Sequence, residues 1–139
     1  MKHSIWAIVP AAGIGKRMQS AVPKQYLSLN DRPVIEYTLN NLLKNKHVSG
    51  LVVALQEDDA YWQDIALRSD KPVIRAQGGA ERADSVRNAL DALKQSEQFD
   101  EENDWVLVHD AVRPCVRQDD IDRLVTEVAD DKNGGLLAL

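Results

Sequence analysis

Small and basic residues follow a short apolar run near the start of the chain. The run is Ile5–Val9, and residues 10–26, which we call the first loop, read Pro-Ala-Ala-Gly-Ile-Gly-Lys-Arg-Met-Gln-Ser-Ala-Val-Pro-Lys-Gln-Tyr. A loop of small residues after a buried strand can bring backbone N–H groups close to phosphate oxygens. Lys16, Arg17 and Lys24 add positive charge to this loop. The segment therefore predicts a binding site for a nucleoside triphosphate.

Two common phosphate-binding motifs differ from the first loop at identifiable positions. Gly-Ile-Gly at 13–15 begins like a dinucleotide-binding fingerprint, but Met18 occupies the position of the third glycine. A P-loop needs Ser or Thr directly after Lys16, where this chain has Arg17. With both motifs excluded, the segment is a loop of small residues followed by positively charged side chains. Such side chains can stabilise the negative charge that develops on phosphate oxygens during phosphoryl-type transfer.

A second motif, His109-Asp110-Ala111-Val112-Arg113-Pro114, follows the apolar run Trp105–Val108. Ligands of open α/β sheets bind at the carboxyl ends of strands, where a carboxylate can hold Mg²⁺ together with phosphates and water. Asp110 is the candidate metal ligand, and Arg113 is placed to bind a phosphate. His109 is either a ligand or a packed histidine, and the sequence leaves both readings open.

A third motif, residues 77–86, contains two glycines between an apolar run and a helical pattern. Gly78 and Gly79 allow close backbone approach to a planar base, the helix start offers free N–H groups, and Ser85 can add a hydroxyl. The alternative is a purely structural turn, with Glu81 favourable in the first helical turn.

The elements that must position these motifs alternate along the chain. Continuous apolar runs, typical of parallel strands covered on both faces, predict strands at Ile5–Val9, Leu51–Leu55, Val73–Ala76, Trp105–Val108 and Leu136–Leu139. Helical spacing predicts helices around residues 35–43, 86–93 and 121–128, with Pro33 in a first turn and a weaker helix near Trp62 and Ile65.

This alternation predicts an α/β fold with a doubly wound, mostly parallel, Rossmann-like sheet. With a 3-2-1-4 strand order, all three motifs would follow neighbouring strands and converge on one cleft. The chain ends on an apolar segment directly after Gly134-Gly135, so we expect it to be truncated as a strand begins.

Composition and charge exclude several classes of protein and of binding partner. The 139 residues form a single domain (1–139) with 44% hydrophobic residues, and no apolar run is long enough to cross a bilayer. We expect no signal peptide, and the single Cys115 cannot form an internal disulfide, so a cytoplasmic location is expected.

The formal net charge is −5, although residues 1–30 contain four Lys or Arg and no Asp or Glu. A basic loop on an acidic body suits a small anionic ligand rather than a nucleic acid or a membrane.

All three motifs carry a resemblance to a known family. The first loop resembles the opening motif of nucleotidyltransferases that couple a nucleoside triphosphate to a phosphorylated sugar or polyol, through Pro10-Ala11-Ala12-Gly13, Gly15, Arg17, Met18 and Pro23-Lys24-Gln25-Tyr26. With Gly78-Gly79-x-x-Arg82-x-x-Ser85-Val86 and the second motif, the chain is similar to the 2-C-methyl-D-erythritol 4-phosphate cytidylyltransferase family of the non-mevalonate route to isoprenoids. Ribitol-5-phosphate cytidylyltransferases share much of the pattern.

The resemblance implies a nucleotide-diphospho-sugar transferase-like fold and a role for each matching residue. In the implied reaction, a phosphate oxygen of the acceptor attacks the α-phosphorus of CTP, Mg²⁺ assists, and pyrophosphate leaves. Arg17 and Lys24 would be catalytic and Asp110 would bind the metal. The nucleotide and acceptor would meet Pro10, Ala11, Ala12, Gly13, Gly79, Ala80, Ser85, Ala111 and Arg113.

The chain departs from the family pattern at two positions and in length. Ala80 stands where the family often has Asp, and Val112 replaces a usual Ala. Family members continue beyond Leu139 with an arm that pairs two subunits and with residues that bind the polyol phosphate, so the resemblance implies a homodimer at full length. The other readings are a ribitol-5-phosphate cytidylyltransferase and a non-catalytic nucleotide-binding fragment.

Overall fold

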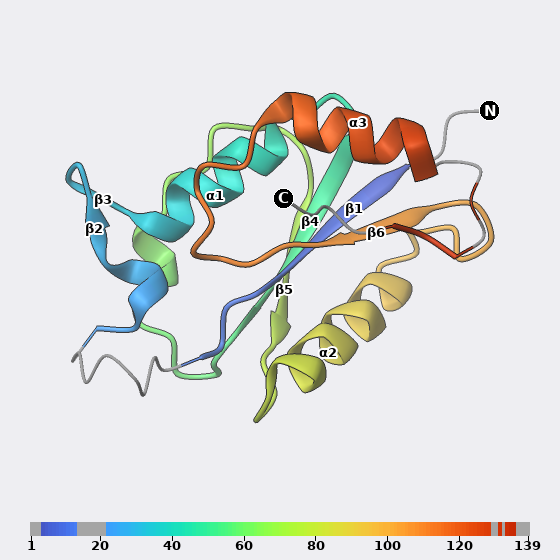
Figure 1. Cartoon of the computed structure of the whole chain (residues 1–139). Helices are drawn as coiled ribbons and strands as arrows, with labels where there is room; N and C mark the ends of the chain where they lie inside the picture. The colour runs from blue at the N-terminus through green and yellow to red at the C-terminus, as the bar shows by residue number, and fades with distance from the viewer. Residues whose placement is uncertain (1–3, 14–21, 129–130, 132, 136–139) are drawn as a thin grey trace.

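A four-stranded parallel sheet forms the centre of the molecule (Figure 1). The computed structural model describes residues 4–13, 22–128, 131 and 133–135. The strand order is β5 (Val73–Gln77), β4 (Val48–Leu55), β1 (Ile5–Pro10) and β6 (Trp105–Val108), and every neighbouring pair is parallel. This order confirms the predicted 3-2-1-4 sheet. The strand predicted at Leu136–Leu139 lies outside the described residues.

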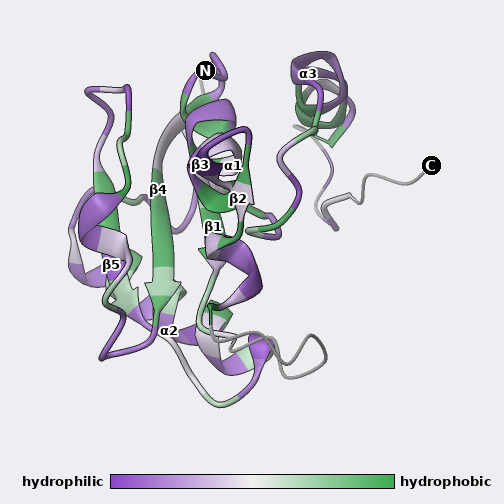
Figure 2. Ribbon diagram, turned by 90° about the vertical axis from the view of Figure 1, so that its left-hand side faces the viewer, coloured by the Kyte–Doolittle hydropathy of each residue, from purple (hydrophilic) through white to green (hydrophobic). Residues whose placement is uncertain are grey.

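Helices cover both faces of the sheet, which confirms the doubly wound prediction. Figure 1 shows α1 (Val34–Leu43) and α3 (Gln118–Val128) on one face and α2 (Arg82–Gln95) on the other. Along β1, Ala7 and Val9 pack in the cluster beneath α1 and α3, whereas Trp6 and Ile8 pack in the cluster beneath α2. Because both faces are buried, the strand is apolar at every position rather than at alternate ones. Figure 2 shows this concentration of hydrophobic residues along β1 and β4.

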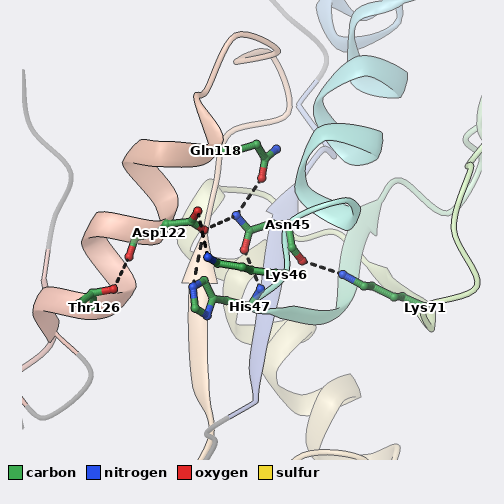
Figure 3. Close-up of polar contacts among 7 residues, drawn as sticks. All are labelled: Asn45, Lys46, His47, Lys71, Gln118, Asp122 and Thr126. Atoms are coloured by element: carbon green, nitrogen blue, oxygen red, sulfur yellow. Dashed lines mark hydrogen bonds and ion pairs between the residues drawn. The ribbon is translucent and has the colours of Figure 1, made fainter.

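Polar side chains attach α3 to the end of α1 (Figure 3). Asn45, which is 1% exposed, donates through Nδ2 to Gln118 Oε1 at 2.8 Å and to Asp122 Oδ1 at 3.0 Å. Its backbone carbonyl accepts from Lys71 Nζ at 2.7 Å. The Asn45 side chain therefore connects the end of α1 to α3, and its backbone carbonyl connects it to the segment that leads into β5.

The weaker helix predicted near Trp62 and Ile65 is wrong, because only a single 3-10 turn, η2 (Trp62–Asp64), forms there. Side chains of α1 capture backbone donors that a longer helix would use internally. Glu36 Oε1 accepts from the Ala66 N–H and Asn40 Oδ1 accepts from the Arg68 N–H, both at 2.8 Å. The 3-10 turn ends at Ile65, whose backbone is extended.

A short hairpin that the sequence did not predict precedes α1. Its strands are β2 (Ser28–Leu29) and β3 (Arg32–Pro33), and Asn30 and Asp31 between them have φ values of 51° and 69°. Two-residue hairpin turns favour such residues, because their backbones tolerate positive φ. Pro33 belongs to this hairpin and caps α1 from outside instead of lying in its first turn. Among the described residues, no helix is long and apolar enough to cross a membrane.

Candidate active site

Four loops meet at the carboxyl edge of the sheet, where open parallel sheets bind their ligands. In the strand register, Pro10 pairs with Ala54 and Ala54 pairs with Ala76. Two residues further along each chain lie Ala12, Gln56 and Gly78, which consequently reach the same level of the sheet. The loops that follow β1, β4 and β5 therefore meet directly above the end of β4.

The beginning of the first loop is held by two glutamine side chains. Gln25 Nε2 donates to the carbonyl of Ala11 at 2.8 Å and to that of Gly13 at 3.2 Å. Gln56 Nε2 donates to the carbonyl of Ala12 at 2.6 Å. Three consecutive carbonyls are thus occupied, while the N–H groups of Ala12 and Gly13 have no acceptor among the described residues. Within the described part of the chain these two amides can accept an anion as partner, and the phosphate site expected for this loop stays a prediction.

The glycine of the third motif lets its turn touch the first loop. A Cβ atom on Gly78 would lie 2.0 Å from Ala12 Cβ and 3.3 Å from the carbonyl oxygen of Leu55. No side chain fits between these backbones, so a glycine is required for the two loops to meet. The Gly78 N–H also donates to the Leu55 carbonyl at 2.7 Å. The third motif is therefore fixed both to β4 and to the first loop.

Residues at the start of α2 hold the rest of this turn in place. Ser85 is 3% exposed, and its Oγ accepts from the Gly79 N–H at 3.0 Å. Glu81 and Asp84 form a capping box, in which each side chain accepts from the other residue's backbone N–H. Ala80 is exposed at the tip of the turn. Ser85 thus acts on the backbone here, and its predicted contact with a nucleotide base stays a prediction.

Asp110 connects the second motif with the third. Its Oδ1 accepts from Arg82 Nη2 at 3.0 Å and Nε at 3.3 Å, and its Oδ2 accepts from Arg113 Nε at 2.9 Å. Burial acts to raise the pKa of Asp110, but the hydrogen bonds from the two arginines outweigh it and the pKa is lowered. Asp110 is consequently an ionised carboxylate at the mouth of the site, where a cation or a phosphate-bound metal can reach it.

His109 and Ala111 lie on either side of Asp110, and His109 is partly buried whereas Ala111 is buried. His109 Nδ1 lies 2.8 Å from the carbonyl oxygen of Asp110, and because a carbonyl only accepts, this nitrogen carries the hydrogen. Burial lowers the pKa of His109. Ala111 is 6% exposed, and its carbonyl accepts from Thr38 Oγ1 at 2.8 Å. Of the two readings of His109, the structure favours the packed histidine with one nitrogen satisfied.

Lys24 begins the 3-10 turn η1 (Lys24–Tyr26) and is exposed, whereas the two residues after it are buried. Tyr26 donates from its hydroxyl to Asp59 Oδ2 at 2.6 Å and stacks on Tyr61 at 4.9 Å between ring centroids. Burial and the Asp59 carboxylate raise the pKa of the Tyr26 hydroxyl. The turn is thus anchored by Gln25 and Tyr26 and leaves Lys24 facing outward. Arg17, the other predicted catalytic cation, lies outside the described residues.

Few side chains of the site could hold the predicted magnesium. Among the described residues, no group of three or more His, Cys, Asp or Glu side chains could hold a metal by itself. Asp110 offers one carboxylate, whose Oδ1 accepts from two nitrogens of Arg82, whereas its Oδ2 accepts from Arg113 Nε and keeps one lone pair for a further ligand. One carboxylate fits Mg²⁺ that takes its remaining ligands from phosphates and water. The residues present therefore fit a metal that arrives with the nucleotide.

Two residues of the site were not recognised from the sequence. Arg82 was part of the third motif but had no assigned role, since its partner Asp110 lies 28 residues away. Gln56 belongs to no motif, and only the register of β4 against β1 brings it to the first loop. Both depend on tertiary contacts, although polar residues directly after a buried strand are a general signal for this edge of a sheet.

A cavity of about 820 Å³ opens elsewhere, between the N-terminal end of β1, β6 and α3. Its lining includes Lys46, His47, Trp105 and Leu124. None of the predicted site residues that the structure describes lines it, and the loops described above lie at the opposite edge of the sheet. The chemistry of the motifs therefore locates the candidate active site at the carboxyl edge and not in this cavity.

A doubly wound sheet with a small-residue loop, an ionised aspartate and arginines at its carboxyl edge has the architecture of the α/β class whose members bind ligands at this edge. The family model for 2-C-methyl-D-erythritol 4-phosphate cytidylyltransferase (IspD) matches residues 5–139. The chain belongs to this family.

Relatives and solved structures agree with this assignment. The chain is 50% identical over 139 residues to the 2-C-methyl-D-erythritol 4-phosphate cytidylyltransferase of Ectopseudomonas mendocina, covering 100% of this chain and 58% of the relative. It is 48% identical over 136 residues to the enzyme of the same name from Pseudomonas fluorescens, covering 98% and 57%. A crystal structure of a 4-diphosphocytidyl-2C-methyl-D-erythritol synthase superposes with a TM-score of 0.80 at 28% identity, over 98% of this chain and 59% of that one. The chain thus spans somewhat more than half the length of the curated relatives it matches.

Proposed function

We propose that the protein carrying this chain transfers CMP from CTP to 2-C-methyl-D-erythritol 4-phosphate in isoprenoid precursor biosynthesis. In this reaction a phosphate oxygen of the acceptor forms a bond to the α-phosphorus of CTP. The bond between that phosphorus and the oxygen bridging to the β-phosphate breaks, and pyrophosphate leaves with the electron pair.

The observation that carries this proposal is the joining of three motifs in a chain of this family. Gly78 connects the third motif to Ala12 of the first loop, and Arg82 connects it to Asp110 of the second. A single ligand at this edge would therefore contact all three. The names of the relatives favour methylerythritol phosphate over ribitol phosphate as the acceptor.

Each part of the site has a proposed task. The amides of Ala12 and Gly13 bind the triphosphate, with Pro10 and Ala11 completing the loop wall. Arg17 and Lys24 stabilise the charge that develops at the α-phosphate, since preorganised cations act most strongly on the transition state.

The cytosine lies over the turn at 79–80. Because Ala80 has only a methyl group, that turn reads the base through its backbone, and Ser85 supports it through Gly79. Ala111 borders the ribose, and Arg113 faces the polyol phosphate.

Three further features belong to the same proposal. Mg²⁺ supplies charge neutralisation on the triphosphate and would be held by Asp110. The protein works as a homodimer at full length. It is cytoplasmic, acts on small molecules, and uses no nucleic acid or membrane as a partner.

The test is a pyrophosphate-release assay on the full chain with CTP, Mg²⁺ and each acceptor in turn. We expect turnover with methylerythritol phosphate, little with ribitol 5-phosphate, and little when ATP or GTP replaces CTP. Equal turnover with ATP would contradict the assignment of the third motif to cytosine. Binding of CTP without pyrophosphate release from any acceptor would instead identify a nucleotide-binding protein that does not catalyse the transfer.

A further inference from the structure

We propose that Gln25 and Gln56 are positioning residues that hold residues 11–13, at the start of the first loop, in a phosphate-binding conformation. The inference rests on the proposed function, because it deepens the role of the same loop. Neither glutamine need touch the nucleotide, and each acts through a backbone carbonyl. The ligand that the pair serves is the polyphosphate portion of a nucleotide.

The two glutamine side chains bond to different carbonyls of the loop. Gln25 is 5% exposed and comes from η1, and its one amide group spans the carbonyls of Ala11 and Gly13. Gln56 is partly buried at the end of β4 and reaches the intervening carbonyl, that of Ala12, at 2.6 Å. Two amides from different elements thereby satisfy three consecutive acceptors.

Because the peptide unit is planar, the glutamine bonds to the carbonyls also orient the N–H groups of Ala12 and Gly13. The carbonyl of Ala11 and the N–H of Ala12 belong to one planar trans peptide unit, so they point in opposite directions. The same relation joins the carbonyl of Ala12 to the N–H of Gly13. Holding each carbonyl against a glutamine consequently turns the following N–H away from that glutamine. These N–H groups are the ones that have no acceptor among the described residues.

Space for a ligand exists beside the second of these amides. A Cβ on Gly13 would meet none of the described residues within 4 Å, and Gly13 is exposed. Ala12, by contrast, is enclosed by Gly78 on one side and held by Gln56 on the other. The loop is therefore rigid at Ala12 and open at Gly13, which is the combination that a preorganised phosphate site requires.

A glutamine is needed at position 56 because the contact requires a donor. Glutamate at neutral pH only accepts hydrogen bonds, so its carboxylate would face the Ala12 carbonyl and repel it. Methionine has nearly the same length but no donor. The glutamate variant also allows a test by pH. Repulsion by the Ala12 carbonyl raises the pKa of the introduced carboxyl, and once this carboxyl is protonated it can donate a hydrogen bond to that carbonyl again.

The experiment compares Gln56→Met and Gln56→Glu with the wild-type full chain, using inorganic tripolyphosphate and CTP as separate ligands in calorimetric titrations. Gln63 supplies the matched control, because it is exposed and its amide also donates to a backbone carbonyl, that of Ala60 at 3.4 Å. Gln63→Met and Gln63→Glu should leave both affinities unchanged. Position 56 is preferred to 25 because Gln25 is buried and its replacement risks the fold.

We expect Gln56→Met to weaken tripolyphosphate binding by roughly 2- to 10-fold, the equivalent of one lost hydrogen bond, and Gln56→Glu to weaken it further. Between pH 7 and pH 5 the affinity of the Glu variant relative to wild type should recover, while that of the Met variant should stay constant. A merely structural role would not produce this difference between the two variants. In turnover, the Michaelis constant for CTP should rise together with any fall in kcat.

Two results would overturn the inference: affinities for tripolyphosphate that match wild type in both position 56 variants, or a wild-type protein that does not bind tripolyphosphate. Failure of the proposed function looks different. A wild-type protein that binds tripolyphosphate in a Gln56-dependent way, but does not prefer CTP or release pyrophosphate, would contradict the cytidylyltransferase and support the positioning role.

Discussion

Replacing Gly78 with alanine tests the contact on which the proposed site depends. The new Cβ would lie 2.0 Å from Ala12 Cβ, whereas ordinary contacts of this kind are 3.4–4 Å. Neither atom can rotate away, because both are attached directly to backbone. Ala12 is held by Gln56 at 2.6 Å, and Gly78 by its own hydrogen bond to Leu55 at 2.7 Å. Relief therefore requires that one loop move and that one of these hydrogen bonds lengthen.

The expected cost follows from these two contributions. Overpacking of a tightly packed contact costs about 1–3 kcal/mol, and the loss of one hydrogen bond adds about 1 kcal/mol. A loss of 2–4 kcal/mol in a chain of this size corresponds to a fall in Tm of roughly 6–12 °C. Binding of CTP should weaken as well, since the displaced loop carries the amides that we propose to bind phosphate.

Gly13→Ala is the matched control, because it lies in the same loop but its new Cβ meets none of the described residues within 4 Å. Its backbone is outside the left-handed region, so alanine should leave the Tm within about 2 °C of wild type or raise it slightly. Thermal unfolding followed by fluorescence measures both variants. If Gly78→Ala unfolds at the same temperature as Gly13→Ala, the two loops do not touch as described and the reasoning is refuted.

Three further predictions concern charged residues. Lys24→Ala should reduce turnover by about 10²–10³-fold while changing CTP affinity far less, and an unchanged kcat would remove Lys24 from catalysis. Asp110→Asn should alter stability by less than about 1 kcal/mol, because its ion pairs are solvent-exposed.

The Asn variant should nevertheless need much more Mg²⁺ for half-maximal rate, and an identical Mg²⁺ titration would make Asp110 purely structural. Glu36 is 4% exposed and bonded to Arg32 and Ala66, so Glu36→Gln should cost about 1–3 kcal/mol at pH 7. Although burial opposes it, these bonds lower the pKa of Glu36 in the folded protein, so the stabilisation is complete above its ordinary value of 4.5 and is lost as pH falls below it. The free energy of unfolding in urea should be measured at pH 7 and at pH 3.5. If the Gln variant differs from wild type by the same amount at both pH values, the predicted loss of stabilisation at low pH is wrong.

The sheet could be predicted from the sequence because its signal is local. Each strand is a continuous apolar run, and a run that is apolar at every position requires cover on both faces. Alternation with helical patterns then leaves few topologies, of which the observed strand order is one. The failure near Trp62 has the opposite cause. That segment has helical spacing, but Glu36 and Asn40 of α1 take its backbone donors, and this competition is invisible in the local pattern.

The site was predictable in its location but not in its internal contacts. Residues after parallel strands meet at one edge of the sheet, so the convergence of the three motifs followed from topology alone. Which side chains touch there depends on the register between strands to within one residue. The contact of Gly78 with Ala12 and the bond from Gln56 both require that Pro10, Ala54 and Ala76 lie side by side, and the sequence does not specify that alignment.

At the carboxyl edge of the sheet, the side chains that hold the backbone are neutral, whereas those proposed to meet the ligand are charged. The cost of burying a charge explains this difference. Gln25 and Ser85, which hold the loop and the turn, are neutral and at most 5% exposed. A neutral amide or hydroxyl can be buried when its hydrogen bonds are satisfied, whereas an isolated buried charge costs far more. The ionised groups Lys24, Arg82 and Asp110 are instead solvent-accessible. Neutral hydrogen bonds thus fix the backbone, and the charged side chains stay in contact with solvent, where the proposed phosphate and metal could reach them.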